Sequence, residues 1–258
     1  MKRIICFLIS VCMLLCLVAC RGEVEHPQEA ESTVSTENRE QTVITENKQG
    51  EESDNTRVLT LEKTFHTYCE WEDDYDRALV RSEHSCVTLG QADADAYPEM
   101  AQVLSQIATM QENAMLDEYD NLVSLAREEL SANRDGFETN VSTLDVLVRR
   151  ADSIVISLLS DSYSHYGQIE NYRVFHGSNY DTQSGRELML NDVVNVNNDL
   201  AQAVEAELTT SVWAGDFYSE TAVEDYFANT PYDGFNWTMD YLGLTFYFSP
   251  GELSTTVC

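Results

Sequence analysis

The chain has 258 residues, and its 45 Asp and Glu against 15 Lys and Arg give a formal net charge of −30 at pH 7. Nucleic acid is held mainly by clusters of Lys and Arg, and since the sequence has none, this composition excludes a nucleic-acid-binding function. The chain is nevertheless 43% hydrophobic, which is enough to build a core.

Residues 1–19 have the pattern of a secretory signal peptide. Lys2 and Arg3 form a basic head, and an apolar run extends from Ile4 to Ala19. The run is shorter than the roughly 20 residues that a membrane-spanning helix needs. We therefore predict that this segment directs export and is removed.

The run ends in Leu17-Val18-Ala19-Cys20, which resembles the lipobox of bacterial lipoproteins. The resemblance implies that the Cys20 thiol carries a diacylglycerol and that the chain is cut before it. Two acyl chains are about what stable anchoring requires. We therefore expect palmitate-containing lipid on Cys20 to hold the protein on the outer side of the cell membrane. The alternatives are a signal peptide cut elsewhere and an uncleaved anchor.

Residues 20–56 are predicted to be a disordered acidic linker. Between Arg21 and Thr56 there are ten acidic residues, five small or aliphatic apolar side chains and no aromatic residue. Such a segment buries too little apolar area to offset the entropy of ordering. Without Lys2 and Arg3 the mature net charge is near −32 (−30 minus +2).

Residues 57–258 are predicted to form one α+β domain. Apolar and polar residues alternate from Arg57 to Trp71, which predicts a strand, and a second strand from Tyr75 to Leu89 would complete a hairpin. Pro98 predicts a helix start, with Asp93 or Asp95 as its cap, and the helical spacing continues to about 133. The later predicted elements are strands at 141–150, 153–165 and 173–180, helices from 191 and at 220–228, and strands at 235–241 and 244–248.

This order of elements predicts a mostly antiparallel sheet with helices packed on one side. Three cysteines remain in the predicted domain, Cys69, Cys86 and Cys258. Outside the cell a disulfide between Cys69 and Cys86 is plausible, and the alternative is two buried free thiols. The sequence gives no role to Cys258.

Two segments, within residues 152–194 and 237–250, resemble a known family. The first reads Asn179-Tyr180-Asp181-Thr182-Gln183-Ser184-Gly185-Arg186-Glu187-Leu188, followed by Leu190-Asn191-Asp192-Val193. The second reads Gly243-Leu244-Thr245-Phe246-Tyr247-Phe248, with Pro250. Both are similar to the extracytoplasmic domains of unknown function DUF4163 and DUF3298, and the likeness extends over most of residues 57–250.

Relatives of this family include the extracellular part of a lysozyme-binding anti-sigma factor and a domain attached to a peptidoglycan deacetylase. The resemblance therefore implies an α+β binding module at the cell wall, not a catalyst. Residues 167–171 and the residues after Pro250 depart from the family pattern. The ligand contacts of the lysozyme binder are therefore not carried over.

Candidate sites for chemistry are few. His66 and His84 are predicted on paired strands, where Glu70 or Glu83 could join them, but no spacing typical of a zinc site is present, so we predict no metal. The acidic stretch from Glu70 to Asp76 is interpreted as a solvated hairpin tip. No catalytic residue and no cofactor is predicted.

Aromatic residues gather near the Pro231-Tyr232-Asp233-Gly234 turn. We predict a candidate ligand surface at Tyr232, Phe235 and Trp237, because aromatic side chains beside an exposed turn can stack on a sugar or anchor a protein. The alternative is that Phe235 and Trp237 belong to the core.

The favoured hypothesis is a non-enzymatic lipoprotein whose domain binds a wall glycan or a cationic protein such as lysozyme. One alternative is an enzyme, such as a hydrolase, that acts on wall polymers through carboxylates. Another is a structural accessory lipoprotein of an envelope complex.

Overall fold

The structure is a computed structural model. It describes residues 56–72, 77–167, 172–210, 222–248 and 253, and for residues 35–43 it describes the strand and its pairing. The chain divides into two compact units, and every described residue belongs to the second, Thr33–Cys258. The predicted signal peptide, the lipidation site Cys20 and the last cysteine, Cys258, lie outside the described residues.

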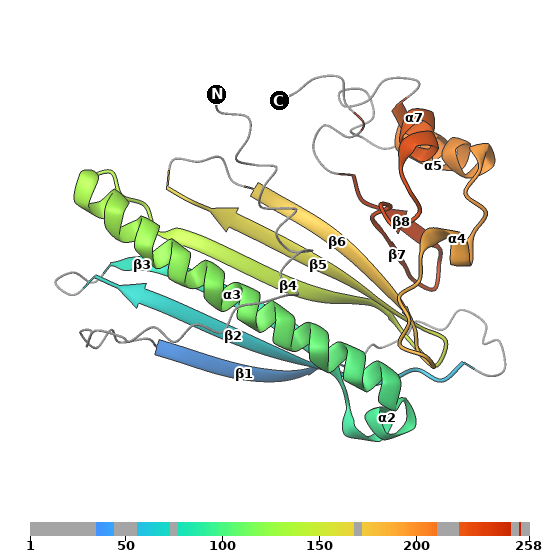
Figure 1. Cartoon of the computed structure of the whole chain (residues 1–258), viewed down its shortest axis with the longest axis horizontal. Coiled ribbons are helices and arrows are strands. Elements are labelled where there is room, and N and C mark those ends of the chain that lie inside the picture. The colour runs from blue at the N-terminus through green and yellow to red at the C-terminus, as the bar shows by residue number, and fades with distance from the viewer. Residues whose placement is uncertain are drawn as a thin grey trace, which may run out of the picture. The chain divides into compact units, whose positions relative to one another are not determined.

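The second unit has an α+β fold with a mostly antiparallel sheet and helices packed on one side, so the predicted fold class is confirmed (Figure 1). Its six-stranded sheet places the strands in chain order. These are β1 (Ser35–Val43), β2 (Leu61–Trp71), β3 (Ala78–Leu89), β4 (Asn140–Ala151), β5 (Val155–His165) and β6 (Tyr172–Asp181). The other described elements are α2 (Gln91–Ala96), α3 (Pro98–Ala132), α4 (Leu190–Val193), α5 (Asn198–Thr210), α7 (Ala222–Asn229) and a two-stranded sheet of β7 (Trp237–Met239) and β8 (Leu244–Phe246).

One strand pair in the six-stranded sheet is parallel. β3 and β4 run in the same direction, with Val80 opposite Asn140, whereas the other neighbouring strands of this sheet are antiparallel. A parallel pair needs a long crossover connection, and here α2 and α3 supply it. Figure 1 shows α3 lying along the sheet that it connects.

Helix α3 is held by an apolar stripe. Met100 and Leu104 are buried near its start, and Tyr119, Leu122 and Ala126 are buried near its end. These intervals of three and four residues place the side chains on one face of a helix. The helix begins at Pro98 as predicted and is continuous to Ala132.

The predicted helix cap is wrong. Tyr97 occupies the N-cap position of α3 and makes no side-chain cap hydrogen bond. Asp93 lies inside α2 instead, where its carboxylate is buried, pairs with Arg57 and accepts a hydrogen bond from the Thr60 backbone N–H at 2.7 Å. An acid near a helix start can cap that helix or accept a hydrogen bond from a distant backbone N–H. Sequence spacing alone does not distinguish capping from the distant hydrogen bond.

Three clusters of buried apolar residues form the core. Two of them contain α3 residues, with Ile156 and Leu158 in the first and Tyr68 and Val80 in the second. The third joins Val155 of β5 to the chain's last elements. Its buried members are Val155, Leu190, Ala201, Val223, Phe227, Phe235, Trp237 and Met239. This third cluster supports the site described below.

The turn between β4 and β5 is built around a buried carboxylate. Asp152 is fully buried, and its Oδ1 accepts hydrogen bonds from the backbone N–H groups of Ile154 and Val155 at 2.8 and 2.9 Å. Its Oδ2 accepts a hydrogen bond from Arg150 Nε at 2.7 Å. Because a buried charge is costly unless it is paired and hydrogen-bonded, this arrangement makes Asp152 a fixed structural element.

One segment of the predicted linker pairs with the sheet. Residues Ser35–Val43 form β1, antiparallel to β2, with Val43 opposite Leu61. The prediction relied on the low apolar content of the linker, and this segment indeed has Val43 as its only apolar residue. An edge strand can pair through its backbone without burying an apolar face, so composition did not reveal it.

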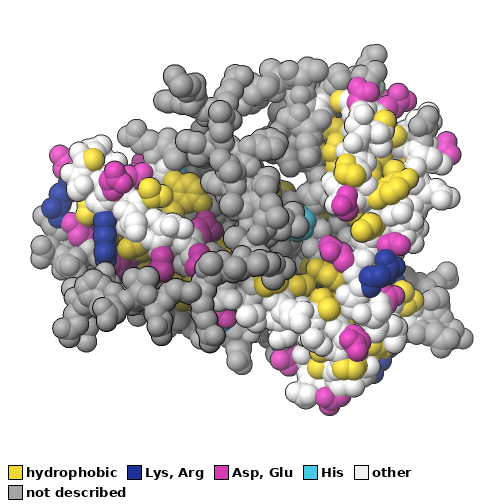
Figure 2. Space-filling model, viewed as in Figure 1, with side chains coloured by type: hydrophobic (Ala, Val, Ile, Leu, Met, Phe, Trp, Pro, Cys, Tyr) yellow, Lys and Arg dark blue, Asp and Glu magenta, His cyan; other side chains and the backbone are white. Residues whose placement is uncertain are grey.

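The described surface is strongly acidic. Figure 2 shows Asp and Glu side chains spread over the visible face, with Lys and Arg in a few small groups. Within the described residues, no helix combines the length and the apolar character needed to cross a membrane.

Candidate functional site

The site lies where the β7–β8 sheet meets β6. Gly177 permits this contact, because a Cβ built on it would lie 2.1 Å from the carbonyl oxygen of Trp237. The Gly177 backbone N–H donates to Asn236 Oδ1 at 2.8 Å, and Asn236 Nδ2 donates to the Phe175 carbonyl at 2.7 Å. Asn236 therefore acts as a clamp that holds the start of β7 against β6.

A buried polar chain extends this contact to β5. The Ser157 hydroxyl donates to Asn179 Oδ1 at 2.7 Å and accepts from the Met239 backbone N–H at 3.0 Å. Asn179 Nδ2 donates to the Trp237 carbonyl at 2.9 Å. Ser157 is fully buried and Asn179 is 2% exposed, so these bonds are shielded from water and fix the position of β7.

The opposite wall of the site follows a tight turn after β6. Asp181 Oδ1 accepts hydrogen bonds from both the backbone N–H and the hydroxyl of Ser184, and the hydroxyl bond, first among several causes, lowers the pKa of Asp181. Gly185 closes the turn with a φ of 66°, a conformation that favours glycine. The turn directs the chain back along β6, where Glu187 pairs with Tyr180.

An ion pair holds the next segment in place. Arg186 Nη1 lies 2.9 Å from Asp192 Oδ2, and this hydrogen bond is the main reason that the pKa of Asp192 is lowered. Asp192 Oδ2 also accepts a hydrogen bond from the Met189 backbone N–H at 2.9 Å, at the start of α4. Residues Glu187 to Met189 therefore form a defined wall.

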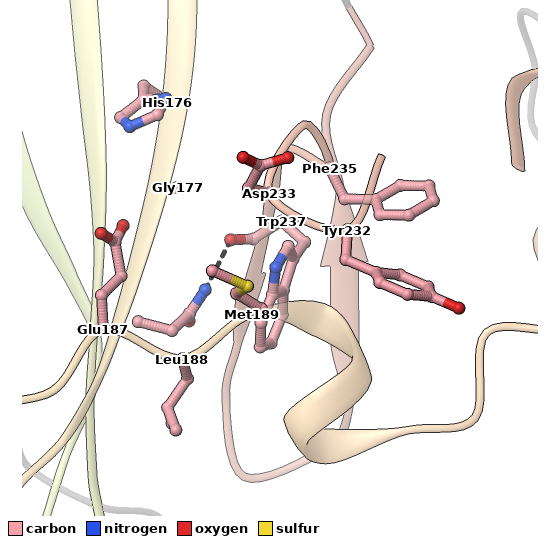
Figure 3. A pocket seen from close by; sticks show the side chains of 10 residues that line it. His176, Gly177, Glu187, Leu188, Met189, Tyr232, Asp233, Phe235 and Trp237 are labelled. Carbon is pink, nitrogen blue, oxygen red and sulfur yellow. Dashed lines mark hydrogen bonds between the residues drawn. The ribbon is translucent and has the colours of Figure 1, made fainter. Parts of the chain in front are cut away.

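These elements enclose a pocket with a volume of about 110 Å³ (Figure 3). One wall comes from β6 and the residues after its turn, and the other from residues 232–237. The lining residues are His176, Gly177, Asn179, Glu187, Leu188, Met189, Tyr232, Asp233, Phe235 and Trp237.

The three aromatic residues predicted as a ligand surface all line this pocket. Tyr232 is 52% exposed, whereas Phe235 and Trp237 are 7% and 3% exposed and belong to the third core cluster. Figure 3 shows the Tyr232 and Phe235 rings turned away from Glu187, with Trp237 nearer the middle. Tyr232 is thus at the rim, and Trp237 forms part of the floor.

The pocket is rich in negative charge and hydrogen-bond acceptors. Glu187 and Asp233 are exposed carboxylates on its two walls, and within the described residues neither forms an ion pair. Burial raises the pKa of the neighbouring Tyr180 phenol, and the Glu187 carboxylate adds to this rise. The site can therefore attract a group that carries positive charge and donates hydrogen bonds.

Two solved structures that are similar to the chain are members of the DUF3298 family. The chain is similar to a DUF3298 family member from Bacteroides fragilis, with a TM-score of 0.43 and 9% identity over 88% of this chain and 95% of that one. It is also similar to a DUF3298 family protein from Pseudomonas aeruginosa, with a TM-score of 0.32 and 13% identity over 71% of this chain and 67% of that one. No family model and no curated protein matches the chain.

The possible disulfide between Cys69 and Cys86 is not present, and both thiols are free. Cys69 lies opposite Arg81, and Cys86 is five positions further along β3. At roughly 3.4 Å per residue this offset is about 17 Å, beyond the approximately 7 Å that a disulfide spans between Cα atoms. The two strands are neighbours as predicted, but their antiparallel register places the thiols toward opposite ends.

The predicted pairing of His66 and His84 is present. The two residues lie opposite each other on β2 and β3, with stacked rings whose centroids are 4.7 Å apart. Tyr68 stacks on His84 at 5.7 Å, and Cys86 Sγ lies 3.9 Å from His66 Nε2. Burial, followed by the nearby His66, lowers the pKa of His84 to about 4. His84 is therefore a neutral core residue near pH 7.

Two acids assigned to the hairpin tip are bound to α3 or the residues after it. Glu70 is 5% exposed and accepts a hydrogen bond from Arg127 at 2.5 Å, and Glu72 pairs with Arg134. The tip itself, residues 73–76, lies outside the described residues. Among the residues that the structure describes, no group of three or more His, Cys, Asp or Glu is arranged to hold a metal ion.

Sequence reasoning missed most of the pocket's other wall. His176, Asn179 and Glu187 were not singled out as ligand-facing residues, although two of them lie in or next to the family-like turn segment. Their side chains reach the aromatic residues only because β7 folds back onto β6, and this tertiary contact has no local sequence signal.

Proposed function

We propose that the chain is a lipid-anchored extracytoplasmic binding module of the cell envelope, whose ligand is a wall glycan or a cationic protein such as lysozyme. The lipobox-like sequence ending at Cys20 supports the anchor. The pocket between β6 and residues 232–237 is the main support for a binding function, because apolar surface combined with a few polar groups is typical of ligand sites.

The anchor is tested by growing cells with radiolabelled palmitate. Wild-type chain and the control Cys258→Ala are expected to take up label, whereas Cys20→Ala is expected to take up none. Equal labelling of the wild type and Cys20→Ala would contradict the anchor.

Binding is tested by pull-down of the purified chain against peptidoglycan and against lysozyme. Retention on one of them, reduced by Tyr232→Ala, supports a binding module that uses the pocket. Turnover of labelled wall polymer that is lost in Asp233→Asn would instead favour the enzyme alternative. Retention of neither material would contradict the proposed ligands.

A further inference from the structure

We propose that the pocket recognises a primary ammonium group at the end of a short alkyl stem, as on a lysine side chain. This inference rests on the proposed function, since it names the ligand class of the same pocket. It follows from the pocket's acceptors, its volume and its apolar floor.

The polar groups of the pocket are mostly acceptors. Glu187 and Asp233 are carboxylates, which accept hydrogen bonds but do not donate them when ionised. The Trp237 carbonyl is already paired with the amide Nδ2 of Asn179, so the two carboxylates are the acceptors available to a ligand. An ammonium group carries three donors and no acceptor, so it matches this set, and charge-assisted hydrogen bonds are stronger than neutral ones.

The charges of the two carboxylates are not neutralised nearby. Within the described part of the chain, Arg186 is the cation next to Glu187 in sequence, and its guanidinium pairs with Asp192 instead. Asp233 forms no ion pair with a described residue. A cationic ligand would therefore bring the missing positive charge to both walls.

The pocket's volume is sufficient for the proposed group. At about 110 Å³ it exceeds several times the roughly 10–15 Å³ that a single water needs. An ammonium group and the methylene groups next to it therefore fit inside.

The lining residues also offer contacts for the alkyl stem. Leu188, Met189 and Trp237 contribute apolar surface, and Figure 3 shows Met189 and Trp237 close together in the middle of the site. Lysine side chains commonly lay their methylene groups on apolar surface while the ammonium reaches polar groups. A planar guanidinium prefers one carboxylate in a two-pronged contact, whereas here the carboxylates lie on separate walls.

The test measures binding to full-length Cys20→Ala chain, which removes the lipid anchor. The probes are Nα-acetyl-lysine amide, the norleucine analogue that lacks the ammonium group, n-butylamine and N-acetylglucosamine, titrated by NMR or calorimetry. We expect the lysine derivative to bind at least tenfold more tightly than the norleucine analogue. The double variant Glu187→Gln/Asp233→Asn should weaken that binding about tenfold, and the control Glu128→Gln on α3 should leave it unchanged.

The probes also distinguish two sources of the same group. Butylamine binding as tightly as the lysine derivative indicates a free alkylamine ligand, and weaker butylamine binding indicates a protein side chain. The inference is overturned if the lysine derivative does not bind, if N-acetylglucosamine or the norleucine analogue binds as well, or if the double variant binds normally. Unchanged retention of the double variant on peptidoglycan or lysozyme would overturn this inference alone and leave the binding module standing.

Discussion

The buried histidine of β3 provides a quantitative test of the core. His84 is 1% exposed, and its pKa of about 4 lies below the ordinary value of 6.5. Near pH 5 the unfolded chain therefore binds a proton at this site that the folded chain does not. The free energy of unfolding is unaffected by this group above pH 6.5, and it falls as the pH drops from 6.5 toward 4. Between pH 7.5 and 4.5 the linkage relation gives a loss of about 2.5 kcal/mol.

Replacement of His84 by Phe isolates this contribution, because a phenyl ring can occupy the stack between His66 and Tyr68 without titrating. Urea denaturation at pH 7.5 and 4.5 gives the loss of stability for each protein. We expect the wild-type loss to exceed that of His84→Phe by about 2.5 kcal/mol. His176→Gln, which changes an exposed histidine, should retain the wild-type loss.

Carboxylates throughout the chain also lose charge on acidification and contribute to the loss of stability of both proteins. The contribution of His84 is therefore the difference between the wild-type loss and the His84→Phe loss, and neither loss alone measures it. Equal losses in the wild type and His84→Phe would refute the assignment of His84 as a buried neutral group.

Other predictions concern packing and thiol chemistry. Gly177→Ala should lower the free energy of unfolding by about 3 kcal/mol, because its Cβ would overlap the Trp237 carbonyl, whereas Gly90→Ala, whose nearest contact is 3.4 Å, should change it by less than about 1 kcal/mol. Asp152→Ala should cost about 3–5 kcal/mol by leaving Arg150 and two backbone donors without their partner, and a variant as stable as the wild type in urea would contradict this. Peptide mapping without reductant should show the cysteines of β2 and β3 unlinked, and a joined peptide pair would contradict the observed register.

Local patterns predicted the sheet and the long helix well. The alternation from Leu61 to Trp71 predicted the extent of β2, although the end of the strand buries Glu70 and exposes Trp71. The apolar spacing after Pro98 corresponds to α3, because burial on one face imposes the period of 3.6 residues on the sequence. The aromatic residues of the 232–237 segment were also identified, since several aromatic residues beside a Pro-Tyr-Asp-Gly turn are conspicuous in a sequence.

What the sequence did not reveal depends on contacts between distant segments. β1 pairs through its backbone, so Ser35–Val43 carries little side-chain signal. The free thiols follow from strand register, and a shift of a few positions would have brought Cys69 and Cys86 together. The pocket wall containing Glu187 faces Asp233 only because Gly177 and Asn236 seat β7 on β6.

The single parallel pair in the described six-stranded sheet has a consequence for the order of folding. Strands β1–β3 and β4–β6 form two halves whose members are sequence neighbours, so each half can assemble through local hairpins. Joining them at Val80 and Asn140 closes a segment of about 60 residues, which costs roughly 3.6 kcal/mol in chain entropy beyond a constant. We expect this closure to come late, so truncation of Val80 should speed unfolding more than it slows refolding.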